Sequence, residues 1–213
     1  MIHFLVMAYR PTERTQARLA ATRERIVAAA LAQVADGGYR SASVQRLARR
    51  AHVAVGTVYR HFPSKGDLFA EAFRRASQRE LDVVVQVSET DGSCRERVAA
   101  AVEAFCRRAL AGPVLAYALL AEPVDPAVEA ERLRFRIGYR DAFATVLADG
   151  VRHGELRPHD THTVAAALVG ALGEALVGPL SIANGRGSHE PLVATLVQFC
   201  EEALPRAQER VHA

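Results

Sequence analysis

The sequence predicts an all-α protein. Apolar residues recur every three to four positions through most of the chain, the spacing that gives a helix one buried face. Alanine, leucine and valine dominate, Trp is absent and aromatic residues make up only 6% of the chain, a composition typical of helices packed on helices. No alternating apolar and polar run is long enough to predict a strand. With 213 residues, half of them apolar, the chain can bury the core of one or two domains.

The first predicted helix runs from about Thr22 to Ala35. Its buried stripe consists of Ile26, Val27, Ala30, Leu31 and Val34. Gly37 and Gly38 follow directly, and one of them can end the helix by adopting a left-handed conformation. Residues 1–21 are expected to form a flexible N-terminal extension.

Two short helices joined by a tight turn are predicted next. Ser43 can open the first of them, because its hydroxyl can accept a hydrogen bond from an unpaired amide of the first turn. The second helix extends from Val55 to Phe62, with Val58 and Phe62 four residues apart on its buried side. Its other faces carry hydroxyls, an Arg and a His.

This helix pair has the geometry of a DNA-binding helix-turn-helix, in which the second helix enters the major groove. A structural helical hairpin without a DNA partner would show the same periodicity, so the charge distribution is needed to choose. Residues 1–80 hold 14 Lys and Arg against 6 Asp and Glu, a net charge of +8, whereas the remainder has a net charge of −5. A basic N-terminal third on an acidic remainder is typical of a polyanion-binding domain on a soluble body.

The run from Ala51 to Leu68 resembles the DNA-binding domain of TetR-type transcriptional regulators. The positions that match that family's pattern are Val53, Gly56, Thr57, Val58, Tyr59, His61, Phe62, Pro63, Ser64 and Lys65. The resemblance covers about residues 22–70. It implies about nine helices, divided between an N-terminal three-helix DNA-binding domain with a helix-turn-helix and a C-terminal helical ligand-binding and dimerisation domain.

Three positions depart from that pattern. His52 replaces the usual turn glycine, Ala54 replaces the usual serine cap, and Val55 stands where a polar residue is frequent. If the turn needs a positive φ at residue 52, His is strained there by about 1–2 kcal/mol. The missing hydroxyl at residue 54 costs about 1 kcal/mol of helix capping. Neither cost is large enough to unfold a packed three-helix unit.

The resemblance implies which side chains hold the DNA backbone. Tyr59 and His61 would contact phosphate oxygens, and Thr57 a phosphate or a nearby base. Lys65 would add a positive charge beside helix-terminal amides that already favour an anion. Gly56 would permit close approach of the backbone to DNA. Tyr59 could instead simply cover the hydrophobic core.

Other residues of the pair are candidates for reading bases. Arg60 and Val55 occupy positions that vary in such proteins, so we expect them to choose the sequence. An Arg can bind guanine O6 and N7 together, and an apolar side chain can contact a thymine methyl. Gln45 could add a contact from the first helix of the pair. Arg60 could also be only a solvated cation.

The remainder of the chain is predicted to be helical. Ser64 and Asp67 form a capping box that opens a long linking helix towards Val87. The polar break at 89–93 is the first predicted boundary, which gives a DNA-binding domain at 22–88, an effector-binding and dimerisation domain at 89–205 and a C-terminal tail at 206–213. Further helices are expected at about Arg95–Leu110, Pro113–Ala121, Pro126–Gly150, Asp160–Gly178 and Pro191–Leu204, separated by breaks rich in Gly and Pro.

The expected partners are a double-stranded DNA operator and a second copy of the chain. One head makes too few contacts for specificity, so a twofold homodimer reading a near-palindrome is predicted. The last two helices are the candidate dimer elements. The first of them offers the small residues Ala166, Ala167, Gly170, Ala171 and Gly173. These helices could instead pack within one subunit.

A ligand-responsive regulator would also need an effector pocket in the middle helices. The candidate ligand-binding residues are Phe105, Tyr117, Phe135, Tyr139 and Phe143. The last three repeat every four residues along one helix face, a spacing that is also typical of core packing. Arg107, Arg136 and Arg140 could pair with an acidic ligand or could simply be solvated.

The sequence predicts neither an enzyme nor a cofactor or metal site. It contains no nucleophile elbow, phosphate-binding loop or zinc-helix motif. His159 and His162 could ligate a metal, but no further Cys or His cluster completes a site. Three widely spaced cysteines, Cys94, Cys106 and Cys200, do not suggest a disulfide framework and fit a reducing cytoplasm.

The segment Thr163–Ala183 is apolar and long enough to span a bilayer. Glu174 near its centre, three internal glycines and Pro179 argue against insertion. We therefore predict a cytoplasmic DNA-binding transcriptional regulator, a repressor that leaves its operator when a small apolar or amphipathic effector binds. The alternative is a regulator without a ligand, controlled by its concentration or by a protein partner.

Overall fold

The computed structural model describes residues 12–181 and 189–207, and these residues form nine α-helices and no β-sheet. The helices are α1 (Glu13–Ser41), α2 (Val44–Arg50), α3 (Val55–His61), α4 (Lys65–Ser88), α5 (Cys94–Ala111), α6 (Pro113–Leu120), α7 (Pro126–Arg152), α8 (Thr161–Ser181) and α9 (Glu190–Glu202). The predicted all-α class is confirmed, and every predicted helix has its counterpart. The predicted break at 184–188 and the outermost residues of both predicted tails lie outside the described residues.

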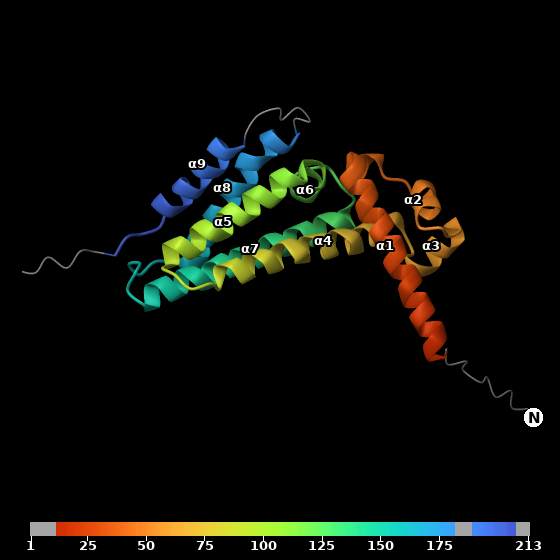
Figure 1. Ribbon diagram of the computed structural model, residues 1–213, viewed down its shortest axis with the longest axis horizontal. Helices are drawn as coiled ribbons and strands as arrows, with labels where there is room; N and C mark the ends of the chain where they lie inside the picture. Colours follow the sequence, from red (N-terminus) through yellow and green to blue (C-terminus); the bar gives the residue numbers. More distant parts are fainter. Residues whose placement is uncertain (1–11, 182–188, 208–213) are drawn as a thin grey trace, which may run out of the picture.

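Helices α1, α2 and α3 and the first three turns of α4 form one end of the molecule, which we call the head (Figure 1). Its core is built around Ile26, Leu47 and Phe69, all fully buried. Val58 of α3 and Phe62, which directly follows the helix, are 1% and 3% exposed, so the predicted burial of both residues is confirmed.

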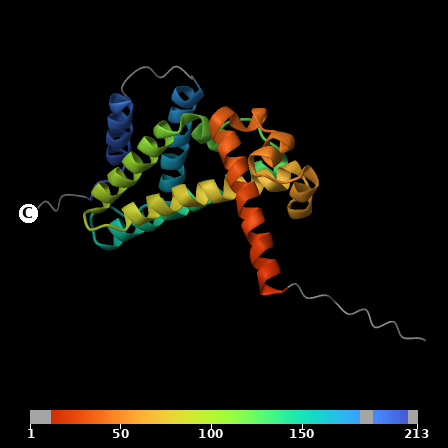
Figure 2. The same ribbon diagram turned by 45° about the vertical axis from the view of Figure 1, so that its right-hand side comes forward.

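Helix α1 begins at Glu13, well before the predicted start at Thr22. The Thr12 hydroxyl caps it by accepting a hydrogen bond from the Thr15 amide at 3.3 Å. Residues 13–21, expected to be part of a flexible extension, are therefore helical. Figure 2 shows this part of α1 extending away from the other helices. The prediction missed it because most of its side chains are exposed, so no buried apolar stripe marks it.

The end of α1 is shaped by two glycines. Gly37 and Gly38 leave helical geometry, and Gly38 has the positive φ expected of one of these glycines, 74°, but its ψ of 172° is extended rather than that of a left-handed helical cap. The chain then turns Tyr39 into the head core, where its ring meets Phe69 and Phe73 edge-on, with centroids 5.2 and 5.9 Å away. Tyr39 is therefore buried in the head core, with 4% of its surface exposed.

The α2–α3 pair has the three features expected from its sequence. The Ser43 hydroxyl accepts a hydrogen bond from the Arg46 amide at 3.3 Å and so caps α2. Ala54 precedes α3 without a side-chain cap. His52 has a φ of 54°, in the region that disfavours residues other than glycine.

The rest of the chain forms the body, which comprises α5 to α9 and the remainder of α4. Figure 1 shows α4 running from the head along α7. Helices α5, α8 and α9 lie together on one side of this pair, above it in the view. Val98, Leu147 and Cys200 are among the fully buried residues of the body core. The end of α6 and the start of α7 belong partly to the head, since Ala118 and Val128 are buried in the head core.

Among the described helices, α8 alone is apolar and long enough to cross a membrane by length and composition. Only 28% of its most apolar 18-residue window is buried in the chain. It packs on α6 and α7 through Leu168, Leu172 and Leu176 on its buried side. The opposite side leaves apolar surface uncovered.

Candidate functional site

The candidate DNA-reading residues of α3 lie on its outer surface. Val55 and Tyr59 are 38% and 47% exposed, Gly56 and Arg60 are exposed, and Thr57 is half-buried. With 47% of its surface exposed, Tyr59 is not a buried core residue. His61, at the end of the helix, is half-buried, and Gln45 is exposed on α2.

The surface around these residues carries positive charge that the head does not neutralise. Arg46, Arg49 and Arg60 are exposed and have no carboxylate partner among the described residues. Arg50 is the exception, because it pairs with Asp36 of α1 at 2.5 Å. Free guanidinium groups beside an exposed short helix are suited to the phosphates that flank a major groove.

Lys65 occupies a more constrained position than the sequence suggests. It is the first residue of α4 and is half-buried. Its Nζ lies 4.7 Å from the centroid of the Tyr39 ring and 5.7 Å from that of Phe69, within the range of cation–π contacts. The ammonium group that is expected to contact a phosphate therefore already packs against aromatic rings of the head core.

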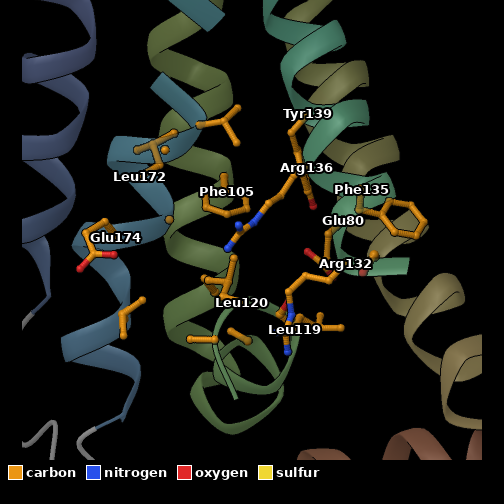
Figure 3. A pocket seen from close by; sticks show the side chains of 18 of the residues that line it. Glu80, Phe105, Leu119, Leu120, Arg132, Phe135, Arg136, Tyr139, Leu172 and Glu174 are labelled. Carbon is orange, nitrogen blue, oxygen red and sulfur yellow. The ribbon is translucent and has the colours of Figure 1, made fainter. Parts of the chain in front are cut away.

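A cavity of about 1240 Å³ opens in the body between α4, α5, α6, α7 and α8 (Figure 3). Four of the five predicted ligand-binding aromatics line it, namely Phe105, Phe135, Tyr139 and Phe143. Phe135 and Phe143 belong both to the core and to the cavity wall, since they are 6% and 3% exposed and still line the cavity. Phe105 and Tyr139 meet edge-on, with ring centroids 5.4 Å apart.

Tyr117 is the predicted ligand-binding residue that the structure places elsewhere. It is absent from the cavity wall and packs, half-buried, against the body core. The reason is helical geometry: Leu115 and Leu119 line the cavity, and two positions along a helix turn a side chain by about 200°. Periodicity within α6 alone gave no sign of which face looks into the cavity.

Charged side chains enter the cavity wall, and most of them are paired. Glu80 of α4 accepts from Arg108 of α5, with Nε and Oε2 2.5 Å apart. Arg140 pairs with its neighbour Asp141 at 2.8 Å. Arg136 lines the cavity without a hydrogen bond or ion pair among the described residues. Arg107, also considered for an acidic ligand, lies outside the wall and pairs with Glu103 and Glu190.

Arg132 is a residue of the wall that sequence reasoning missed. Its side chain is 8% exposed and reaches from α7 to the end of α6 (Figure 3). It donates hydrogen bonds to the carbonyl oxygens of Ala118, Leu119 and Glu122, at 3.0, 3.1 and 2.7 Å, and pairs with Glu129. One guanidinium thus fastens the α6–α7 link to the cavity wall.

The same link is fastened to the head at its other side. The Glu122 carboxylate accepts hydrogen bonds from the backbone amides of Tyr39 and Arg40, at 2.7 and 2.9 Å. Asp125 accepts from the Tyr39 hydroxyl. Burial, together with the nearby Asp125 carboxylate, raises the pKa of Tyr39, so its hydroxyl stays protonated and donates at neutral pH. We call Glu122, Asp125 and Tyr39 the clasp.

The remaining candidate chemistry is weak. Cys94, Cys106 and Cys200 are buried free thiols, and burial raises their pKa to about 11, 12 and 11, which keeps them protonated and unreactive. The described residues contain no group of three or more potential metal ligands. Between His159 and His162, Asp160 serves as a cap of α8 by accepting from the His162 and Thr163 amides.

Comparison with known proteins agrees with this layout. Residues 26–72 match the family model of bacterial regulatory proteins, tetR family. The chain is 47% identical over 57 residues to the HTH-type transcriptional repressor KstR of Rhodococcus jostii, a match that spans 27% of each chain. It is 23% identical over 134 residues to the fatty acid metabolism regulator protein of Bacillus subtilis, covering 62% of this chain and 69% of that protein.

The whole fold also has solved counterparts. The crystal structure of FadR from Bacillus subtilis in complex with stearoyl-CoA superposes with a TM-score of 0.73 at 18% identity, covering 84% of this chain and 98% of FadR. At that identity the likeness establishes the fold alone. The head thus matches the tetR family of bacterial regulatory proteins over residues 26–72, and the chain shares its two-part helical fold with FadR.

Proposed function

We propose that this chain is a transcriptional repressor that binds a palindromic operator as a homodimer and leaves it when a small apolar or amphipathic molecule enters the body. The head supplies the DNA-binding surface, with α3 in the major groove. Arg60 and Val55 choose bases, with Gln45 adding a contact, while Thr57, Tyr59, His61 and Lys65 hold phosphates and Gly56 allows close approach. KstR, the relative with the higher identity at the head, is itself a repressor.

One observation carries the ligand-responsive part of this proposal. Leu115 and Leu119 of α6 line the cavity and also pack against the head core. A molecule that displaces these side chains must therefore alter the packing of the head. Close-packed interiors transmit such displacements, because their side chains have no free volume into which to relax.

Arg132 and the clasp give the same coupling a polar route. Arg132 holds the α6–α7 link against the cavity wall, and Glu122 and Asp125 hold that link to Tyr39. A ligand that shifts the link would tilt the head and change the distance between the two reading helices of a dimer. A coupling free energy of about 1–3 kcal/mol is enough for a 5–150-fold change in DNA affinity.

The wall of the cavity favours an apolar or amphipathic effector. Most of it consists of aliphatic and aromatic side chains contributed by five helices. Its volume of about 1240 Å³ exceeds the roughly 300–1,000 Å³ usual for small-molecule sites, so a large ligand fits. The FadR structure with stearoyl-CoA shows such a molecule bound to a protein of this fold.

The test has two stages. Fragments of the source genome that the purified chain selects would be sequenced, and a palindromic consensus bound by two copies supports the repressor. Addition of apolar and amphipathic molecules to the complex, followed by fluorescence anisotropy, should then release the DNA. Specific DNA binding that no molecule of such a panel weakens would favour the alternative of control by concentration or by a protein partner.

A further inference from the structure

Within the proposed function, Arg136 is the feature of the cavity that points to a particular class of effector. We propose that the effector is an amphipathic carboxylic acid whose carboxylate binds Arg136 inside the cavity, with its apolar part along the aliphatic wall. This inference rests on the cavity being the effector site and adds the chemistry of the group that is recognised.

Arg136 differs from every other arginine of the wall. Arg108, Arg132 and Arg140 each bind a carboxylate of the chain. Arg136 has no hydrogen-bond or ion-pair partner among the described residues. In Figure 3 its guanidinium extends from α7 across the cavity towards Phe105 of α5, and so faces apolar groups. Arg136 is itself exposed, so water serves its five N–H donors until an anion enters, and a bound carboxylate would replace that water.

A second cation of the wall lies near Arg136. Burial lowers the pKa of Arg132, its partner Glu129 opposes this shift, and the charge of Arg136 adds to it through a weaker repulsion. A carboxylate at Arg136 would relieve that repulsion and could accept two parallel hydrogen bonds from one guanidinium.

Neither acidic side chain of the wall pairs with Arg136. Glu80 is committed to Arg108. Glu174 of α8 is exposed, and its carboxylate points away from Arg136 in Figure 3. The Tyr139 hydroxyl lines the same cavity, and burial raises its pKa, so it remains a neutral donor that can hydrogen-bond an anion.

The rest of the cavity is suited to the apolar part of such an acid. Its aliphatic wall residues include Leu115, Leu119, Leu133, Val169 and Leu172. Burying an alkyl chain against them raises the affinity by about fourfold per methylene group, but this contribution cannot distinguish an acid from an alcohol of the same length. The distinction falls on Arg136.

The experiment measures direct binding to the full chain at pH 7 without DNA, by displacement of the neutral fluorophore N-phenyl-1-naphthylamine. The probes are dodecanoic acid, dodecan-1-ol, dodecanoyl-CoA, and a polycyclic carboxylic acid with its matching alcohol. The variants are Arg136→Gln and, as the matched control, Arg134→Gln. Arg134 lies on the same helix, is 55% exposed, pairs with Glu131 and is absent from the cavity wall.

In the natural chain at least one acid should bind about tenfold or more tightly than its alcohol, the usual strength of a hydrogen bond to a charged group. Arg136→Gln should abolish that preference and leave alcohol binding unchanged. Arg134→Gln should retain it. Equal affinity for acid and alcohol, no binding of any acid, or a preference that survives Arg136→Gln would each overturn the inference.

The thioester probe separates two sources of acidity. Dodecanoyl-CoA has no carboxylate on its chain and carries its charges on distant phosphates. If it binds more tightly than dodecanoic acid and Arg136→Gln has no effect on it, the carboxylate site is wrong while an effector cavity stands. Because DNA is absent from this assay, its failure leaves operator binding, tested separately, untouched.

Discussion

The backbone at His52 is a source of strain that single substitutions can measure. A residue other than glycine at a φ of 54° costs roughly 1–2 kcal/mol, and glycine avoids this cost but loses about 0.4–1 kcal/mol through the greater entropy of the unfolded chain. We therefore expect His52→Gly to raise the free energy of unfolding by about 0.5–1 kcal/mol, measured by urea denaturation at fixed protein concentration. His52→Ala is the control, because alanine keeps the strain. An alanine variant as stable as the glycine variant would show that φ is not the cause.

A second prediction at this scale concerns Arg60. Its side chain is exposed and unpaired, so Arg60→Ala should leave the free energy of unfolding within about 0.5 kcal/mol of the natural value. On DNA it should relax base preference at one position per half-site, where a good bidentate contact supplies about 1–3 kcal/mol of discrimination.

Lys65→Ala provides the comparison in the same anisotropy measurement. A lost phosphate contact should weaken all sequences alike and reduce the slope of log affinity against log salt by about one. If both variants lose the same affinity on every sequence, the division into base-reading and phosphate-binding roles is wrong.

Between elements, a buried carboxylate joins α1 to α4. Glu71 is 9% exposed and accepts from Arg23 of α1 at 2.9 Å, and from Arg74 and Arg75 of its own helix. Burial works to raise the pKa of Glu71, but the three guanidinium groups outweigh it and lower this pKa to about 2. The folded state therefore binds this proton more weakly than the unfolded chain, whose pKa is near the ordinary 4.5.

The sign of the pH dependence follows from this difference. The ionised Glu71 stabilises the folded state at every pH above the ordinary pKa, and this contribution is lost as pH falls from about 5 towards 2. Glu71→Gln should thus destabilise the chain most at neutral pH, and its difference from the natural chain should shrink in acid. Thermal melts between pH 3 and 7 would measure it. The matched control is Asp91→Asn, at an exposed carboxylate after α4 that has no ion pair among the described residues.

The clasp yields a prediction about communication between elements. Glu122→Gln weakens the two hydrogen bonds to the Tyr39 and Arg40 amides without touching α3. We expect it to leave DNA affinity and cavity binding close to natural, and to lower the fold by which an effector weakens DNA binding. Anisotropy titrations with and without a bound effector would give both values. Glu131→Gln, remote from the head contacts, should keep the full effect, and an undiminished response in Glu122→Gln would contradict the proposed route.

These elements also show how far sequence reasoning reaches. The positions of α4 to α9 follow from periodicity and from Gly and Pro breaks, because each helix buries one stripe of its own side chains. The positive φ of His52 followed from the family pattern. The contact of Glu122 and Asp125 with Tyr39 could not be predicted, since it joins residues more than 80 positions apart. The early start of α1 was missed because a protruding helix needs only a local cap.

For the molecule as a whole, the head and the cavity share a wall. Leu115 and Leu119 face both, and Ala118 and Val128 complete the head core from the body side. The predicted boundary at residues 88–89 coincides with the end of α4, but the head core includes side chains from beyond it. An isolated fragment of residues 22–88 would lack these four apolar side chains, so its head core would be incomplete.

The outer sides of α8 and α9 carry exposed apolar and small side chains. Phe199 of α9 is 50% exposed, and the outer side of α8 presents Ala167 and Gly170, small residues that allow close helix approach. An exposed aromatic ring and small residues are suited to close contact between subunits, so we expect these helices to form the dimer interface. We expect Phe199→Glu to abolish the proposed dimer, since it would place two carboxylates in a twofold interface.

Sedimentation equilibrium would measure the mass, and operator binding should fall with it, because a single head loses the second half-site. The matched control is Leu19→Glu, which adds the same charge at another exposed apolar side chain, 42% exposed on the protruding part of α1. This variant should stay dimeric. If Phe199→Glu also stays dimeric, or if the natural chain sediments as a monomer at the concentrations that bind DNA, the α8–α9 face is not the dimer interface, and the spacing of the two heads must be set elsewhere.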